Sequence, residues 1–130
     1  MISLERAQRL ITAGIAEAER QNLALAFAVV DAAGHLVASA RMDGAPWIAP
    51  EVALGKAWTA AAYGAPSAAQ GEKMQSLHAF SAAVSAATHG RYTPQIGGLP
   101  VTDGDAVIGA MGASGGTGQQ DEDVVRAALS

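Results

Sequence analysis

Residues 23–42 read LALAFAVVDAAGHLVASARM. The first eight, Leu23 to Val30, are too continuously apolar for an exposed strand, and the Asp31 and Gly34 that follow suit a tight turn. Beyond that turn, apolar residues alternate with others as far as Met42, so the second segment has one apolar and one mixed face. We therefore expect a β-hairpin whose first strand is central in its sheet or covered on both faces.

Helical signals flank this hairpin on both sides. Apolar residues recur every three or four positions after Ser3, which suits an N-cap, and Pro50 suits the first position of another helix. Further along, a second hairpin turns at residues 103–105. The expected elements outside the first hairpin are helices over residues 4–18, 50–62, 67–88 and 119–129 and strands over residues 99–102 and 106–113. This order predicts an antiparallel β-sheet with helices packed on its faces, which is an α+β fold.

The composition fits a single domain over residues 1–130. A chain of 13.1 kDa has the size of one domain, and half of its residues are hydrophobic, which is enough for a core without disulfide or metal staples. Alanine dominates that half and aromatic residues make up only 5%, so helices and strands can approach closely but each contact buries little area. Association into an oligomer would supply the missing burial.

Charge and cysteine content exclude several functions. Eight Lys and Arg against 12 Asp and Glu give a net charge of −4, the wrong sign for gripping a nucleic-acid backbone. The absence of cysteine excludes thiol catalysis, disulfides and Cys-ligated metal centres. The charged start, Met1 to Arg6, and the lack of a long apolar run argue against a secretory signal and a membrane span. We therefore expect a cytoplasmic protein without nucleic-acid or membrane partners.

Lys56 stands out in the expected second helix, because no acidic residue lies three or four positions away to pair with it. Two interpretations stay open: a surface lysine whose ammonium reaches water, or a clamp for a carboxylate or phosphate. Thr59 lies one turn away and would face the same pocket. Arg41 and Asp43 lie where a strand passes into a loop, a common place for binding groups, although a salt bridge or a turn cap explains them equally well.

The three histidines do not predict a metal site. His78 and His89 would be roughly 16 Å apart on one helix, and His35, beside a turn glycine, fits a solvated strand residue. A single histidine, or another oxygen or nitrogen donor, would suffice as an axial ligand to a haem, and the sequence does not select the donor. The glycine-rich residues 109–118 lack the ending of a nucleotide P-loop, so we expect a turn beside a helix N-terminus.

Six short blocks of sequence carry a family resemblance. They are VDAAGHLV (residues 30–37), RMDGA (41–45), KAWTA (56–60), GGLP (97–100), IGAMGASGG (108–116) and QDE (120–122). In this order they resemble the GlcG/HbpS-type haem-binding family, over almost the whole chain.

The resemblance implies a profilin-like fold, with an antiparallel sheet flanked by helices, and homo-oligomers that include octamers. It also implies haem as the ligand, bound near subunit interfaces, and some similar proteins are described as haem-degrading. The residues that carry over because they lie inside matching blocks are Arg41, Asp43, Lys56, Thr59, Gly97, Gly98, Ser114 and Asp121. Arg41 and Lys56 suit the propionates of a haem or the carboxylate of a smaller acid. The aromatic candidates for a pocket wall are Trp47, Trp58, Tyr63 and Tyr92.

The first functional hypothesis is a homo-oligomer that holds haem or a related tetrapyrrole between the expected second helix and the loop from Arg41 to Trp47. Its cofactor-binding residues would be Arg41, Lys56, Thr59, Gly97 and Gly98. No metal ligands other than those to a haem are expected.

The alternative hypothesis is a cofactor-free isomerase, dehydratase or decarboxylase acting on a small anionic metabolite. Lys56 and Arg41 would position its carboxylate in one pocket, and Asp43, His35 or His89 would exchange a proton. A third hypothesis is a structural role, in which alanine-rich surfaces assemble the oligomer and no pocket chemistry takes place.

Overall fold

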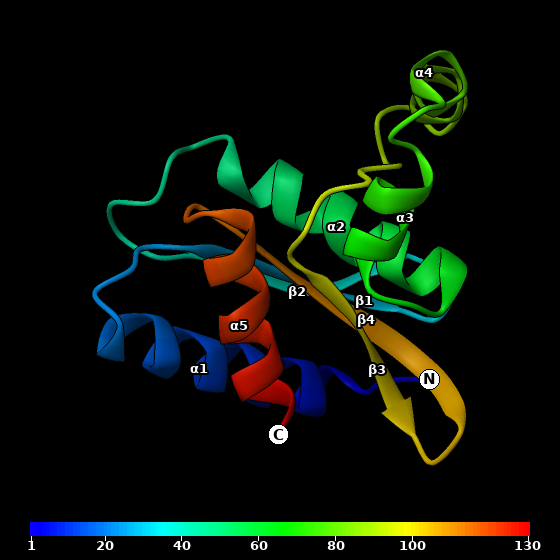
Figure 1. The fold of residues 1–130 in the computed structure, drawn as a ribbon. Coiled ribbons are helices and arrows are strands. Elements are labelled where there is room, and N and C mark those ends of the chain that lie inside the picture. Colours follow the sequence, from blue (N-terminus) through cyan, green and yellow to red (C-terminus); the bar gives the residue numbers. More distant parts are fainter.

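The computed structural model describes residues 1–130 as five helices and one four-stranded antiparallel sheet (Figure 1). In chain order the elements are α1 (Leu4–Arg20), β1 (Ala26–Asp31), β2 (Leu36–Arg41), α2 (Ala49–Tyr63), α3 (Ser67–Lys73), α4 (His78–Ala87), β3 (Gly98–Asp103), β4 (Ala106–Ser114) and α5 (Gly118–Leu129). The strands lie in the order β2-β1-β4-β3. This arrangement confirms the predicted α+β fold. None of the helices is long and apolar enough to cross a membrane.

β1 lies at the centre of the sheet, paired with β2 on one side and β4 on the other, as its unbroken apolar sequence predicts. α1 and α5 pack together on one face of the sheet, and α2 covers the opposite face (Figure 1). Phe27 and Val29 belong to the larger core cluster under α1 and α5, whereas Val30 belongs to the smaller cluster under α2. Neighbouring residues of β1 therefore contribute side chains to the core clusters on the two faces of the sheet.

α2 packs on the sheet almost without large side chains. Its residues in the smaller core cluster are Ala57, Ala60 and Ala61. Gly112 of β4 lies so close to the helix that an added Cβ would be 2.3 Å from the Ala53 carbonyl oxygen. Alanine and glycine thus let helix and strand approach backbone to backbone, as the composition predicts, while each contact buries little area.

The alternation expected in the second strand is interrupted at Val37. Val29 pairs with Ala38, but Val30 pairs with Leu36, so Val37 is an extra residue in β2. This bulge brings Val37 and Ala38 together to the side of α1, where both pack against the larger core cluster. Val37 therefore does not lie on the mixed outer face where strict alternation places it.

The single helix predicted over residues 67–88 is wrong, because the chain forms two helices, α3 and α4, separated by residues 74–77. The turn between them buries Met74 and leaves Leu77 exposed. The bend after Lys73 gains the burial of Met74, which stabilises it over a continuous helix.

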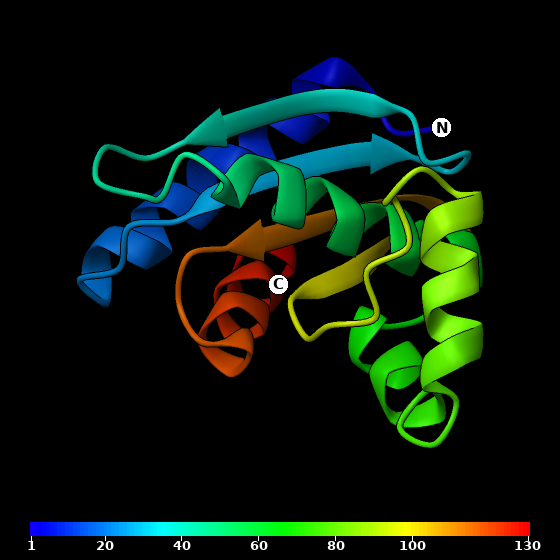
Figure 2. The ribbon, with the colours of Figure 1, turned by 90° about the horizontal axis from the view of Figure 1, so that it is seen from above.

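α4 projects from the body of the molecule (Figure 1), and the view from above shows it along its length at one edge (Figure 2). It has no buried residue and contacts no other helix or strand. It contains no Asp, Glu, Lys or Arg, and the side chains of Leu77 and Phe80 are 44% and 57% exposed. One link to the chain beyond it is a hydrogen bond that the Ser85 hydroxyl donates to the Tyr92 carbonyl oxygen. The single chain therefore leaves an apolar helix uncovered.

Candidate functional site

Lys56 lies inside the molecule with only 4% of its surface exposed. It comes from the middle of α2, and its Nζ donates to the Ala113 carbonyl oxygen and to Asp121 Oδ2, each at 3.0 Å. The interpretation of Lys56 as a surface lysine is wrong, because its ammonium does not reach bulk water, and the ammonium already has an anionic partner within the chain. That partner comes from the last helix, 65 positions further along the chain.

Asp121 is held on both of its carboxylate oxygens. Oδ2 accepts from Lys56, and Oδ1 accepts from the Gly116 backbone N–H at 2.9 Å. The residue belongs to the first turn of α5, whose start is fixed by a capping box between Thr117 and Gln120. The ion pair therefore has a defined geometry, set by the ends of β4 and α5 as well as by α2.

Gly97 and Gly98 make room for Lys56. A Cβ on Gly97 would lie 2.7 Å from Lys56 Nζ, and the residue has φ +140°, a backbone conformation that favours glycine. A Cβ on Gly98 would lie 2.3 Å from the Lys56 carbonyl oxygen. These two glycines, predicted to bind a cofactor, therefore act first by letting α2 and its lysine approach the start of β3.

A hollow of about 340 Å³ opens beside the ion pair, and we call it the Lys56 hollow. Its lining residues are Val52, Lys56, Gln95, Ile96, Ser114, Gly116, Gly118 and Asp121. The Ser114 hydroxyl and the Gln95 carboxamide make no hydrogen bond to another residue, and both groups stay accessible to water. Because polar and charged side chains with free hydrogen-bonding capacity form much of the wall, the hollow is suited to a small polar ligand.

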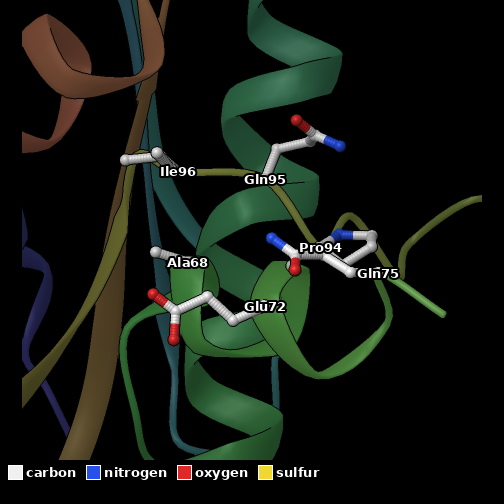
Figure 3. Close-up of a pocket in the computed structure, with 7 residues that line it drawn as sticks. Ala68, Glu72, Gln75, Pro94, Gln95 and Ile96 are labelled. Carbon is white, nitrogen blue, oxygen red and sulfur yellow. The ribbon is translucent and has the colours of Figure 1, made fainter.

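A second hollow of about 260 Å³ adjoins the first and shares Gln95 and Ile96 with it. Figure 3 shows that its wall is formed by α3, with Ala68 and Glu72, on one side and by the segment from Pro94 to Ile96 on the other. The short segment before β3 therefore separates two neighbouring hollows.

Arg41 and Asp43 lie away from Lys56. Both are exposed, and they line another hollow with Ile15 and Glu19 of α1, on the other face of the sheet from α2. They make no salt bridge with each other. The common pocket of Lys56 and Arg41, expected from the sequence, does not form within one chain, because the sheet separates the two residues.

The sequence profile described as "Haem degrading protein HbpS-like" matches residues 2–130. The chain belongs to the HbpS-like family. Protein GlcG of Escherichia coli strain K12 is 37% identical over 114 residues, which cover 88% of this chain and 81% of GlcG. The crystal structure of Klebsiella pneumoniae protein ORFY superposes with a TM-score of 0.90 at 33% identity, covering 98% of this chain and 88% of that chain. The crystal structure of a PduOC:haem complex superposes with a TM-score of 0.88 at 26% identity, covering 98% and 92%.

Thr59 of this HbpS-like chain is fully buried and turns away from the Lys56 hollow. Its hydroxyl donates to the Gly55 carbonyl oxygen at 2.8 Å and accepts from the Thr93 backbone N–H at 2.8 Å. It therefore ties α2 to the segment that leads into β3, and its position in a matching block reflects this packing.

All three histidines are exposed. His35 has an 81% exposed side chain, and its Nδ1 lies 3.7 Å from Asp31 Oδ2 at the first hairpin. His78 is the first residue of α4, and His89 lies just beyond the end of that helix with φ 55°. No group of three or more His, Asp or Glu side chains is placed to hold a metal ion. Two histidines thus flank the uncovered helix.

The four aromatic candidates do not form one pocket wall. Trp47 is 78% exposed, Trp58 packs beneath Gly34, and Tyr63 and Tyr92 meet edge to face with ring centroids 6.0 Å apart.

Burial raises the pKa of the Tyr92 phenol above its usual range, with a smaller contribution from Tyr63. The Tyr92 hydroxyl donates to Gln70 Oε1 at 2.9 Å. The uncovered surface of α4 was not predicted from the sequence, although residues His78 to Ala87 contain no charged residue, and this absence is a signal for it.

Proposed function

We propose that this HbpS-like protein binds haem or a related tetrapyrrole as a homo-oligomer, at a surface formed by residues 77–89 that we call the α4 surface. Membership of the HbpS-like family and the likeness to the PduOC:haem complex support this proposal. The observation that carries it is the isolation of α4, an apolar helix with a histidine at each end and no contact to another helix or strand.

The hollows of a single chain do not fit a haem. The five main hollows measure about 260 to 550 Å³, and none is lined by a histidine or an aromatic residue. The Lys56 ammonium, assigned to a propionate by the resemblance, is buried against Asp121. A closed haem pocket within one chain is therefore not proposed.

The α4 surface offers what the hollows lack. His78 supplies an exposed imidazole, a common axial ligand to haem iron. Leu77 and Phe80, three positions apart, present exposed side chains on one side of the start of α4, on a different side from His78, and offer apolar contact to a macrocycle or to a covering subunit. Arg91, exposed beyond the other end of the helix, would supply a cation for a propionate. Bound haem would supply a coloured, redox-active iron centre.

A second copy of the chain completes this site. A helix of ten residues is marginal in water without tertiary contacts, yet α4 receives none from the other helices and strands of its own chain. Covering it with a second copy would bury Leu77 and Phe80 and enclose a tetrapyrrole between two subunits. Octamers, which the family resemblance implies, and a cytoplasmic location stay predictions.

A hemin titration of the purified protein, followed by absorbance, tests the proposal. We expect a saturable, sharp Soret shift, with affinity reduced at least tenfold in His78→Ala because the axial ligand is lost. His35→Ala is the matched control, since this histidine is also exposed but lies at the first hairpin, outside the α4 surface, and it should bind as the unmodified protein does. Non-saturating binding, or equal affinity in His78→Ala and His35→Ala, would refute the site.

Haem degradation is the further activity in the family's description, and we propose to test it on the same complex. Bound hemin with ascorbate and dioxygen should lose its Soret band faster than free hemin, with iron release measured by a chelator. Equal rates of Soret loss for bound and free hemin would show that the protein binds haem without degrading it. Cofactor-free catalysis in a shared pocket of Lys56 and Arg41 is not proposed, because these residues line separate hollows.

A further inference from the structure

We infer that the Lys56 hollow is a binding site for a small monocarboxylate of two to four carbon atoms. This site is separate from the α4 surface, because none of residues 77–89 lines it. The inference does not rest on haem binding, so either proposal can fail without the other.

The buried ion pair beside the hollow is costly for the fold. Lys56 and Asp121 are 4% and 1% exposed, and taking two charges out of water costs about as much as their attraction returns. An apolar pair of similar volume would stabilise the fold equally well or better. Gly97 and Gly98 are also needed to bring the ammonium into place. The fold therefore does not need a charged pair here for its stability, and the pair lines the wall of a hollow that a ligand could enter.

Several hydrogen-bond donors around the hollow have no acceptor within the chain. Lys56 has three N–H donors, of which two are satisfied within the chain. The Ser114 hydroxyl and the Gln95 carboxamide are free, and the Gly118 N–H at the start of α5 has no acceptor in the chain. A carboxylate offers two oxygens with about four lone-pair positions and can accept from several of these donors together.

Charge and size define the class of ligand. The charges of Lys56 and Asp121 cancel, so the remaining field is the partial positive charge at the N-terminus of α5, which at about half an elementary charge neutralises a single negative charge more completely than two. The volume of about 340 Å³ lies at the lower end of ligand pockets. Val52 and Ile96 provide the apolar wall for a short alkyl group. A short monocarboxylate satisfies all three conditions.

Titration with sodium propionate, followed by backbone amide NMR shifts, tests the inference. Propionamide is the control for the ligand, because it has the same shape without the charge, and sodium chloride controls for ionic strength. We expect saturable shifts at Ser114, Gly116 and Gly118 with propionate, and much weaker binding of propionamide. Equal responses to the two compounds, or no saturation with either, would overturn the inference.

Two variants localise the site without breaking the ion pair. Ser114→Ala and Gln95→Ala each remove a side-chain group that makes no hydrogen bond within the fold, so both variants should stay folded. Each should weaken propionate binding roughly tenfold, as expected for the loss of a hydrogen bond to a charged group. Gln75→Ala, in the neighbouring hollow, is the matched control and should leave binding unchanged. Unchanged binding in Ser114→Ala and Gln95→Ala would place the ligand elsewhere and refute the site.

Discussion

Lys56 and Asp121 depend on each other, because each is a buried charge that the other neutralises. Removing one partner leaves the other charge buried and unpaired, a change that typically costs about 3–5 kcal/mol. We therefore expect Lys56→Met and Asp121→Asn each to lower the free energy of unfolding by about this amount, measured by urea denaturation. The double variant Lys56→Met with Asp121→Asn should lose less stability than the sum of the two single losses.

The exposed pair of Arg9 and Glu5 provides the control for this prediction. Their charged atoms lie 2.8 Å apart, but the side chains are 64% and 83% exposed. Arg9→Met should change the free energy of unfolding by less than about 1 kcal/mol. Additive losses at Lys56 and Asp121 would show that the two charges do not interact and would contradict the structure.

The sequence predicts only half of this pair. The lack of an acidic residue one turn from Lys56 correctly indicates that its anionic partner lies elsewhere. Asp121 is 65 positions away, and the contact exists only because the sheet brings α2 and α5 together at the end of β4. Lys56, Gly97, Gly98, Ser114 and Asp121 lie in matching blocks and meet in space, whereas Arg41 and Asp43 do not join them.

Tyr92 links α3 to the segment that follows α4, through the hydrogen bond from its hydroxyl to Gln70 Oε1. Since burial raises its pKa in the folded state, the neutral form is favoured there, and its contribution to stability is complete below the unfolded pKa of about 10. As pH rises above that value, the unfolded state loses its proton first and stability falls.

The variant Tyr92→Phe tests this link. At neutral pH it should lower the free energy of unfolding by about 1 kcal/mol, because Gln70 loses its buried donor. Between about pH 10 and the raised pKa of the folded state, the unmodified protein should lose more stability than the variant does. Parallel pH profiles from urea denaturation would contradict the assigned burial of the phenol.

Elements with strong local signals are the ones that the sequence predicts correctly. Ser3 caps α1 as expected, accepting from the Arg6 N–H, and the proline at residue 50 lies in the first turn of α2. The separation of α3 from α4 was not predictable, because it depends on the burial of Met74 in the folded chain. The helical character of α4 was predicted, but its lack of a partner is a property of the tertiary structure.

The whole molecule has an uneven core. The cluster under α1 and α5 contains large side chains, whereas the cluster under α2 consists of Val30 and four alanines. Because the area buried under α2 is small and α4 is uncovered, association adds burial that one chain of 13.1 kDa lacks. Anything that binds the folded assembly, including a second copy, then raises its stability by mass action.

Sedimentation velocity with detection at the Soret wavelength tests the central claim, that haem lies at an α4 surface completed by a second copy. With hemin present, the Soret absorbance should sediment with an assembly of two or more chains of 13.1 kDa each. The variant Phe80→Asp, which places a charge on that surface, should shift both protein and haem absorbance to slower species. Soret absorbance that sediments with a 13.1 kDa monomer, or assembly and haem binding that are unchanged in Phe80→Asp, would contradict the account.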